Sequence, residues 1–272
     1  MPFTISHVAA ILPAWQWLRR RGAASAAIIG AMVPDFGFLS PWRLSRAQTH
    51  GAGALLTFCL PVGLGAWALF QWLVKPAWCA VFPGAWRRRL IAEHGQGRLG
   101  QWRSWLVAGG AVVVGALTHL IWDGFTHENG RGVRMLPLLE DSGPLVAGHL
   151  LPLYRWLQLG SSVLGLGLVL WALWRWMRAA RASGAAVPAG RAMPADGLGP
   201  AECRAWIGAY LLTPLLIAAL AAWRLAHLAS GASLSAVATH LAFAGLGGCA
   251  ASLLAISAAI RLRTAARSRL DA

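Results

Sequence analysis

Charged side chains are scarce in this sequence, and acidic ones are the scarcest. Asp and Glu total nine residues, against 24 Lys and Arg, and charged residues of both signs make up 12% of the 272-residue chain. A soluble domain carries roughly twice that charged fraction. Together with a hydrophobic content of 57%, this scarcity excludes an ordinary soluble globular protein.

Cysteine is also rare, which limits the cross-links and metal sites that the chain can form. Its four cysteines are far apart in sequence, and no two of them have C-x2-C spacing. Cys59 and Cys249 lie within apolar stretches, where a cysteine packs as a small hydrophobe. The sequence therefore predicts neither a disulfide framework nor a sulfur-ligated metal site.

Long apolar stretches dominate the chain instead. A helix needs roughly 18 apolar residues to cross a bilayer. Five stretches come near or exceed that length, and we expect spans at 53–74, 104–122, 160–177, 206–224 and 234–260. The apolar run 23–33 is too short to cross and is expected to form a buried or re-entrant helix. The sequence predicts an all-α, polytopic membrane protein with about five transmembrane helices.

Polar residues are distributed unevenly along this chain. Residues 1–160 hold an N-terminal segment with one helix at about 7–20, the first two spans and a loop at 123–159 with four of the nine acidic residues. Residues 161–272 hold the remaining spans, which are almost bare of polar side chains. We expect a half that carries a polar site, 1–160, and a helical membrane scaffold, 161–272.

Basic residues gather beside the apolar spans, which fits contact with anionic lipid headgroups and not with nucleic acid. The C-terminal tail carries four arginines, whereas the connection before the last span carries only Arg224. The positive-inside rule then places the tail in the cytoplasm, and the loop 123–159 and the N-terminal segment outside. Arg19–Arg21 oppose this orientation, because they would lie on the outer face.

Three residues with metal-binding side chains end the second predicted span. His119, Asp123 and His127 follow one another at intervals of four residues. Positions i, i+4 and i+8 of a helix share one face, so two imidazoles and a carboxylate would converge. Neutral imidazole and carboxylate are ligands of zinc and similar divalent ions. The alternative is a His–Asp hydrogen bond that caps the helix.

Further candidate ligands precede the first span. Two spans return the chain to the same membrane face, so the end of the second span lies at the face where the first span begins. Asp35 and His50 come shortly before the first span, and His7 lies further back. We therefore expect a cluster at one membrane face, with the metal ligands His7, Asp35, His50, His119, Asp123 and His127.

These residues carry a resemblance. The chain begins Met-Pro-Phe-Thr-Ile-Ser-His, continues with Pro-Asp-Phe and with His50 before the first span, and then shows the His-x3-Asp-x3-His block. It resembles an uncharacterised bacterial family of polytopic membrane proteins with these motifs. That family is similar to inner-membrane metal-dependent hydrolases and, through ligand order, more distantly to zinc-dependent phospholipase C. The resemblance implies a multi-pass protein of the bacterial inner membrane.

The likeness to phospholipase C is limited to the order and type of the ligands. A His-x3-Glu motif would be expected downstream, but His149 is followed at that spacing by Leu153. The terminal Trp ligand is also missing. The resemblance therefore implies one or two ions, with zinc as the expected metal, and not three.

Such a site supports hydrolysis of a phosphoester, since a bound metal activates water. Asp35 or Asp123 would serve as general base or bridge two ions. Arg131 and Arg134 follow His127 closely and are candidates for binding a substrate phosphate, with a solvated loop charge as the alternative. We expect a membrane-embedded hydrolase acting on a phosphoester or lipid headgroup. The alternative function is a non-catalytic metal-binding membrane protein, for transport or assembly.

Overall fold

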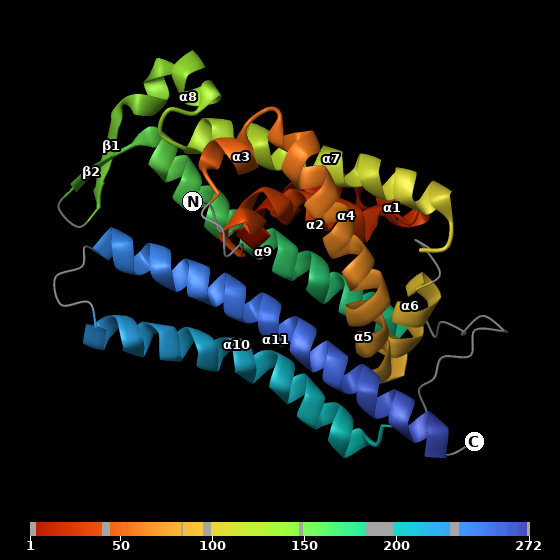
Figure 1. Ribbon diagram of the computed structural model, residues 1–272. Coiled ribbons are helices and arrows are strands. Elements are labelled where there is room, and N and C mark those ends of the chain that lie inside the picture. The colour runs from red at the N-terminus through yellow and green to blue at the C-terminus, as the bar shows by residue number, and fades with distance from the viewer. Residues whose placement is uncertain are drawn as a thin grey trace. The chain divides into compact units, whose positions relative to one another are not determined.

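The computed structural model of the chain describes residues 4–39, 44–82, 84–94, 99–146, 149–182, 198–228 and 234–270. Helices form most of this part of the chain, beside one two-stranded hairpin (Figure 1). Five helices are long and apolar enough to cross a membrane: Leu55–Val81, Trp102–Thr126, Leu153–Arg181, Pro200–Arg224 and Gly247–Arg267. The predicted fold class, a polytopic α-helical membrane protein with about five spans, is thereby confirmed.

Residue contacts divide the chain into two compact units. The first comprises Met1–Gly37, Trp42–Ala68 and Gln96–Arg178, and the second comprises Phe38–Pro41, Leu69–Gly95 and Ala179–Ala272. The helix Leu55–Val81 passes from the first unit into the second. The units therefore interleave along the sequence. The division into a polar-site half, 1–160, and a scaffold half, 161–272, stays a prediction. All six expected metal ligands belong to the first unit.

The first unit contains the long helices α7 and α9, several short helices and a two-stranded hairpin. In chain order the elements are η1 (Thr4–Ala14), α1 (Trp15–Arg20), α2 (Ala24–Met32), η2 (Val33–Leu39), α3 (Arg46–His50), η3 (Leu55–Cys59), α4 (Leu60–Leu69), α7 (Trp102–Thr126), α8 (Arg131–Met135), η5 (Pro137–Glu140), β1 (Ser142–Val146), β2 (His149–Pro152) and α9 (Leu153–Ala182). The expected helix at 7–20 corresponds to η1 and α1. The expected short helix at 23–33 corresponds to α2.

Small residues let α2 lie directly against α7. The buried core between them consists largely of alanines, among them Ala27 and Ala31 on α2 and Ala116 on α7. A side chain at Gly30 would collide with the backbone of Val112, and one at Gly115 would collide with the backbone of α2. Small residues at such contacts are typical of helix packing in membranes. This close approach brings the C-terminal end of α2, and the residues that follow it, to the last turns of α7.

The N-terminal segment forms a helical hairpin that leads away from His7 and returns to Asp35. It turns at Gly22, whose φ of +70° suits a residue without a side chain. Ala27 lies against Gly115, and Ala31 contacts His119, so α2 and α7 run in the same direction. The turn that carries Arg19–Arg21 therefore lies toward the N-terminal end of α7 (Figure 1). Those arginines are at the opposite end of the first unit from His7.

The segment expected as a loop, 123–159, is largely folded. Helix α7 continues to Thr126, and α8 and η5 precede the antiparallel strands β1 and β2, which pair Ser142 with Pro152 and Val146 with His149. Helix α9 begins at Leu153, earlier than the expected start at residue 160. The loop prediction was wrong because these elements are short and lack the long apolar periodicity that marks a span.

The second unit contains η4 (Phe70–Val74), α5 (Lys75–Val81), α6 (Gly84–His94), α10 (Pro200–Leu228) and α11 (Leu234–Leu270). Its core joins alanines of α5 to Ile256 and Ile260 of α11. Glu202 of α10 pairs with Arg267 of α11 at 2.9 Å. This ion pair is partly exposed, so it contributes little to the free energy of unfolding.

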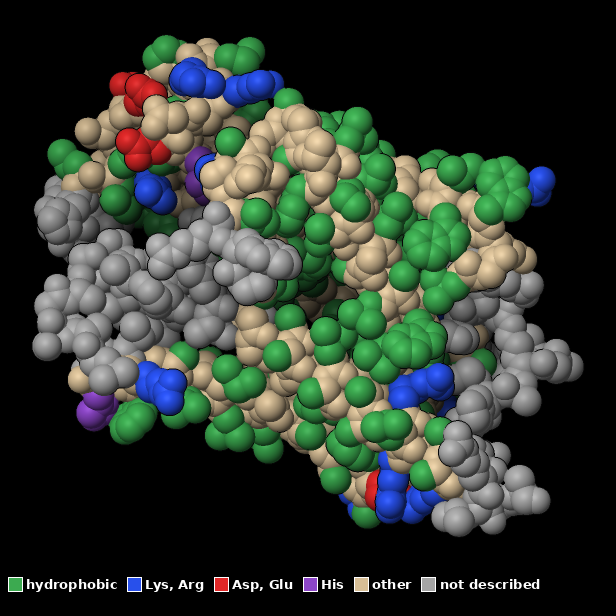
Figure 2. All heavy atoms as spheres, viewed as in Figure 1, with side chains coloured by type: hydrophobic (Ala, Val, Ile, Leu, Met, Phe, Trp, Pro, Cys, Tyr) green, Lys and Arg blue, Asp and Glu red, His purple; other side chains and the backbone are tan. Residues whose placement is uncertain are grey.

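Many large apolar side chains are exposed along the spans. They include Leu117 and Ile121 on α7, Val163 and Leu164 on α9, and a series of leucines on α10. Figure 2 shows hydrophobic side chains spread over the visible face of the molecule. A soluble protein rarely exposes so much contiguous apolar surface. In a membrane protein these side chains face lipid, which accords with the assignment of the five spans.

Candidate metal centre

The expected ligands come from four separate elements, and the structure brings five of them into one buried cluster. His7 lies on η1, Asp35 on η2 and His50 at the end of α3, while His119 and Asp123 lie on the last turns of α7. The side chains of all five are at most 5% exposed. We call His7, Asp35, His50, His119 and Asp123 the buried cluster. Burial of two carboxylates is costly unless charge compensates them.

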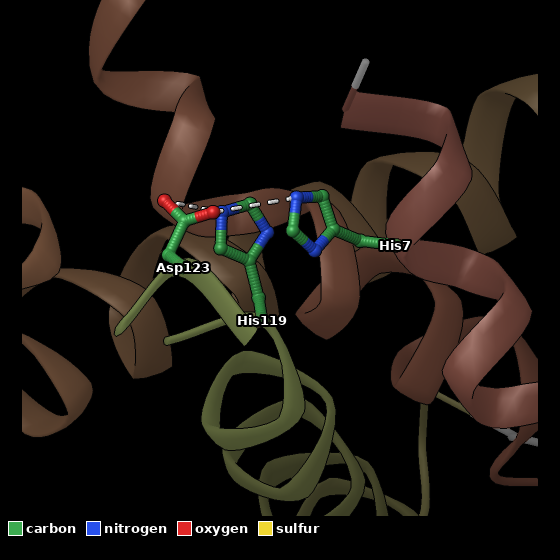
Figure 3. A group of neighbouring side chains, drawn as sticks. All are labelled: His7, His119 and Asp123. Atoms are coloured by element: carbon green, nitrogen blue, oxygen red, sulfur yellow. Dashed lines mark ion pairs between the residues drawn. The ribbon is translucent and has the colours of Figure 1, made fainter. Parts of the chain in front are cut away.

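The imidazoles of the buried cluster direct their Nε2 atoms toward the two carboxylates. His7 Nε2 is 3.6 Å from Asp123 Oδ1, and His50 Nε2 is 3.4 Å from Asp35 Oδ1. His119 Nε2 is 3.7 Å from oxygens of both Asp35 and Asp123. The His7 and His119 rings are stacked, with centroids 3.7 Å apart, beside the Asp123 carboxylate (Figure 3).

Hydrogen bonds on the outer side of the cluster fix which atoms point inward. His119 Nδ1 is 2.8 Å from the carbonyl oxygen of Ala31, so this nitrogen carries the proton and donates it to the backbone. Nε2 of His119 then faces the carboxylates of Asp35 and Asp123. Thr4 donates its hydroxyl to Asp35 Oδ2 at 2.6 Å, which leaves Oδ1 of Asp35 for the interior of the cluster. Partners of this kind orient ligands at metal sites.

Five atoms at the centre of the cluster have no hydrogen-bond partner. Within the described residues, seven buried side-chain nitrogen or oxygen atoms lack one, and five of them are His7 Nε2, Asp35 Oδ1, His50 Nε2, His119 Nε2 and Asp123 Oδ1. Buried polar atoms are almost always hydrogen-bonded. Imidazole nitrogens and carboxylate oxygens that converge in this way can all be satisfied by one kind of partner, a cation bound between them. These residues therefore fit a divalent metal.

Two overlapping groups in this cluster have ligand atoms within 4.8 Å of one another. One consists of His7, His119 and Asp123, and the other of Asp35, His50 and His119. Since an imidazole nitrogen has one lone pair, His119 can bind only one ion at a time. A second ion would depend on the carboxylates and on His7 or His50.

The pKa values of the groups outside the spans suit metal binding at neutral pH. Burial, together with the neighbouring His119, lowers the pKa of His7 to about 4. Burial likewise lowers the pKa of His127 to about 4, against the opposing effect of Asp123. Burial alone would raise the pKa of Asp35, but the nearby His50 and His119 rings and the Thr4 hydroxyl together lower it. At pH 7 this carboxyl is ionised, and the two imidazoles are neutral.

His127 is adjacent to the cluster, but both of its ring nitrogens already have protein partners. Nδ1 is 3.2 Å from the backbone oxygen of Asp123 and 3.4 Å from its Oδ1. Nε2 is 3.2 Å from the amide nitrogen of Gln158, whose oxygen accepts a hydrogen bond from Arg155. This arrangement makes His127 a donor to the backbone oxygen of Asp123. Its role as a metal ligand stays a prediction.

Arg131 and Arg134, the expected phosphate-binding residues, lie on α8 and are exposed. Among the ion pairs found in the described chain, neither guanidinium takes part, and neither joins the buried cluster. Their binding role stays a prediction. The arginine that does reach the cluster is Arg46, whose guanidinium nitrogen is 3.0 Å from Asp123 Oδ2.

Several contacts at the site were missed by the sequence reasoning. Arg46 precedes His50 by four residues, so helical spacing could have placed both on one face. Thr4, the Ala31 carbonyl and Gln158 carry no comparable signal, because each meets its partner through tertiary packing.

Residues 1–258 match the family described as Domain of unknown function (DUF4184). No curated protein and no solved structure matches the chain. Because the match spans nearly the whole sequence, including every residue of the buried cluster, this polytopic membrane protein belongs to the DUF4184 family.

Proposed function

We propose that this protein is a membrane-embedded, metal-dependent hydrolase of phosphoesters, lipid headgroups included. One observation carries the proposal: five unpartnered atoms from His7, Asp35, His50, His119 and Asp123 converge in a buried cluster. Three imidazoles and two carboxylates form a donor set typical of hydrolytic zinc sites. The motif resemblance to inner-membrane metal-dependent hydrolases points to the same chemistry.

The buried cluster would hold one or two divalent ions, with zinc as the expected metal. When bound, such an ion supplies a Lewis acid that activates water and polarises the phosphoryl group. Asp35 Oδ1 and Asp123 Oδ1 are the carboxylate oxygens that protein donors leave free. Either is suited to take the proton from the attacking water, provided that it is not occupied by the ion.

The apolar surroundings favour a substrate with an alkyl part. His119 and Asp123 lie on the last turns of a span, and Ile121 and Trp122 on the same turns are exposed. Trp122 also donates a hydrogen bond from its indole N–H to the Ser161 hydroxyl of α9 at 3.1 Å. This bond joins α9 to the end of α7 that carries His119 and Asp123. A lipid could therefore place its headgroup at the cluster while its chains remain beside these helices.

The charge distribution favours a site on the outer face of the inner membrane. With the C-terminal tail in the cytoplasm, eighteen of the 24 basic residues fall on the cytoplasmic side of the spans: Arg19–Arg21, Lys75, Arg87–Arg89, Arg98, Arg103, Arg175, Arg178, Arg181, Arg191, Arg204, Arg261, Arg263, Arg267 and Arg269. Arg19–Arg21 join this group because the N-terminal hairpin turns at the end of the unit away from His7. On this path Arg19–Arg21 support the proposed orientation.

A second function is favoured by the burial of the ligands. Side-chain exposure of at most 5% throughout the cluster is typical of a closed structural metal site. On that account the protein would bind a metal without catalysis, as a transport or assembly partner.

The test compares metal-loaded and chelator-treated protein in detergent against a panel of phosphomonoesters and phosphodiesters. Metal content is measured by mass spectrometry in the same preparations. Hydrolysis should require the metal and should be lost in Asp35→Asn and Asp123→Asn. The matched control is Asp141→Asn, since Asp141 is exposed and lies outside the cluster. A metal-loaded preparation that hydrolyses no member of the panel would favour the non-catalytic function.

A further inference from the structure

Arg46 is held in place at the edge of the cluster by the fold of α3. Ser45 and Gln48 form a reciprocal cap at the start of this five-residue helix, with the Ser45 backbone nitrogen 2.8 Å from Gln48 Oε1. Such a cap fixes the first turn of a helix. Arg46 and His50 are four residues apart on α3, so they lie on the same face. The helix that supplies the cluster residue His50 therefore also directs Arg46 toward the cluster.

Arg46 connects the buried cluster to the surface. Its guanidinium nitrogen is 3.0 Å from Asp123 Oδ2, yet its side chain is 49% exposed, whereas that of Asp123 is 3% exposed. The same Asp123 oxygen lies 3.6 Å from His50 Nε2 and 3.7 Å from His119 Nε2. A group that enters from solvent and reaches the centre of the cluster would therefore come within reach of the Arg46 guanidinium.

The charges at the site become unbalanced once a metal is bound. Asp35 and Asp123 contribute two negative charges, which one divalent ion neutralises. Arg46 then adds a positive charge that no further carboxylate of the buried cluster balances, and a second ion would increase the excess. A site with this charge attracts an anion, and a guanidinium matches the geometry of two phosphoryl oxygens.

We propose that Arg46 recognises the phosphoryl group of the substrate, exchanging its pair with Asp123 for a pair with the anion bound at the cluster. The inference rests on the proposed metal site and specifies its ligand class as phosphate-bearing. It assigns to Arg46 the role that the sequence had suggested for Arg131 and Arg134. Arg46 is a binding residue here and not a metal ligand.

The experiment uses full-length protein loaded with Co²⁺, whose visible absorption reports changes at the cluster. Inorganic phosphate is titrated into wild type, Arg46→Gln and Arg46→Lys, and cobalt content is measured in each sample. Dioctanoyl phosphatidic acid is titrated in a second arm. The control is Arg103→Gln, which removes one arginine at the start of α7, far along the helix from the cluster.

We expect Arg46→Gln to keep its cobalt and to weaken phosphate binding by about 10- to 100-fold, as for loss of a charge-assisted hydrogen bond. Arg46→Lys should give an intermediate value, and Arg103→Gln should match wild type. Weakening in both arms supports recognition of the phosphoryl group itself. If Arg46→Gln weakens binding of dioctanoyl phosphatidic acid alone, Arg46 recognises the phosphate of a lipid headgroup.

Other results overturn the inference. If the Arg46→Gln variant binds both probes as tightly as wild type, another group recognises the anion. Loss of cobalt from Arg46→Gln would show that the residue acts by holding Asp123 in place. If wild type binds no cobalt, the proposed metal site itself fails; if it binds cobalt but neither probe, only the role of Arg46 fails.

Discussion

The Nδ1–H of His119 donates a hydrogen bond to the carbonyl oxygen of Ala31 at 2.8 Å, and this bond connects α7 to α2. The bond leaves Nε2 of His119 facing Asp35 and Asp123, where it belongs to both candidate ligand groups. The packing of two helices is thereby linked to the direction of a candidate metal ligand.

Replacing His119 should remove most of the bound metal, because no other residue belongs to both groups. We expect this loss in His119→Ala and in His119→Gln, the second of which retains a polar side chain and guards against a simple cavity effect. The measurement is metal per protein after purification. His227→Ala is the control, since His227 is exposed and bonds to the backbone of its own helix. Unchanged metal in both His119 variants would contradict the site.

His127 should behave differently from His119. Its ring nitrogens contact Asp123 and Gln158, so we expect His127→Asn to retain metal but to bind it about 10-fold more weakly, as when a residue that orients a ligand is lost. Competition with a zinc-binding dye would measure the affinity. Gln158→Leu should weaken binding in the same direction, because it leaves His127 without its second partner. If His127→Asn loses metal as completely as His119→Ala, His127 is a direct ligand.

The spans and the candidate ligands could be predicted from the sequence because both depend on local patterns. Apolar stretches of sufficient length identify a membrane helix, and four-residue spacing places His119 and Asp123 on one face. The chain crosses the membrane twice between His50 and the end of the second span. Counting the spans is therefore enough to place His50 and His119 at the same membrane face. These inferences need no knowledge of which helices touch.

The remaining features depend on contacts between segments far apart in the chain. The direction of His119 depends on the Ala31 carbonyl, and the orientation of His127 depends on Gln158, 31 residues away. The short elements between Thr126 and Leu153 also gave no periodic signal. The path of the N-terminal hairpin that carries Arg19–Arg21 could not be predicted from the sequence, because each of its helices is too short to count as a span.

The contact of α2 with α7 at Gly115 should be sensitive to a single methyl group. A Cβ there would meet the Ala27 carbonyl and the Ala31 backbone, so Gly115→Ala should lower stability by about 1–3 kcal/mol, as expected for overpacking. Thermal unfolding in detergent would measure the change, and metal content should fall with it. Gly110→Ala on the same helix meets nothing within 4 Å and serves as the control. Equal stability of the two variants would contradict this packing.

The metal-free protein should lose stability as the pH falls from about 6.5 to 4. His7 and His127 have pKa values lowered from 6.5 to about 4 by burial, so in this range the unfolded chain binds more protons than the folded one. Stability then rises with pH through this window and is fully present above it. Thermal midpoints of chelator-treated protein at a series of pH values would report the effect. His7→Asn should flatten the dependence.

The N-terminal hairpin should place position 20 on the opposite membrane side from the cluster, although the two are close in sequence. The structure turns α1 into α2 at Gly22, toward the N-terminal end of α7, while η5 follows the cluster end of that helix. In a background without the four native cysteines, Leu138→Cys should react with an impermeant maleimide on intact cells, since Leu138 is 66% exposed. Arg20→Cys should react only after the membrane is permeabilised, because the proposed orientation places the arginine-rich turn on the cytoplasmic side. Reaction of both positions on intact cells would mean that the hairpin does not reach across the membrane, and Arg19–Arg21 would again oppose an outward-facing site.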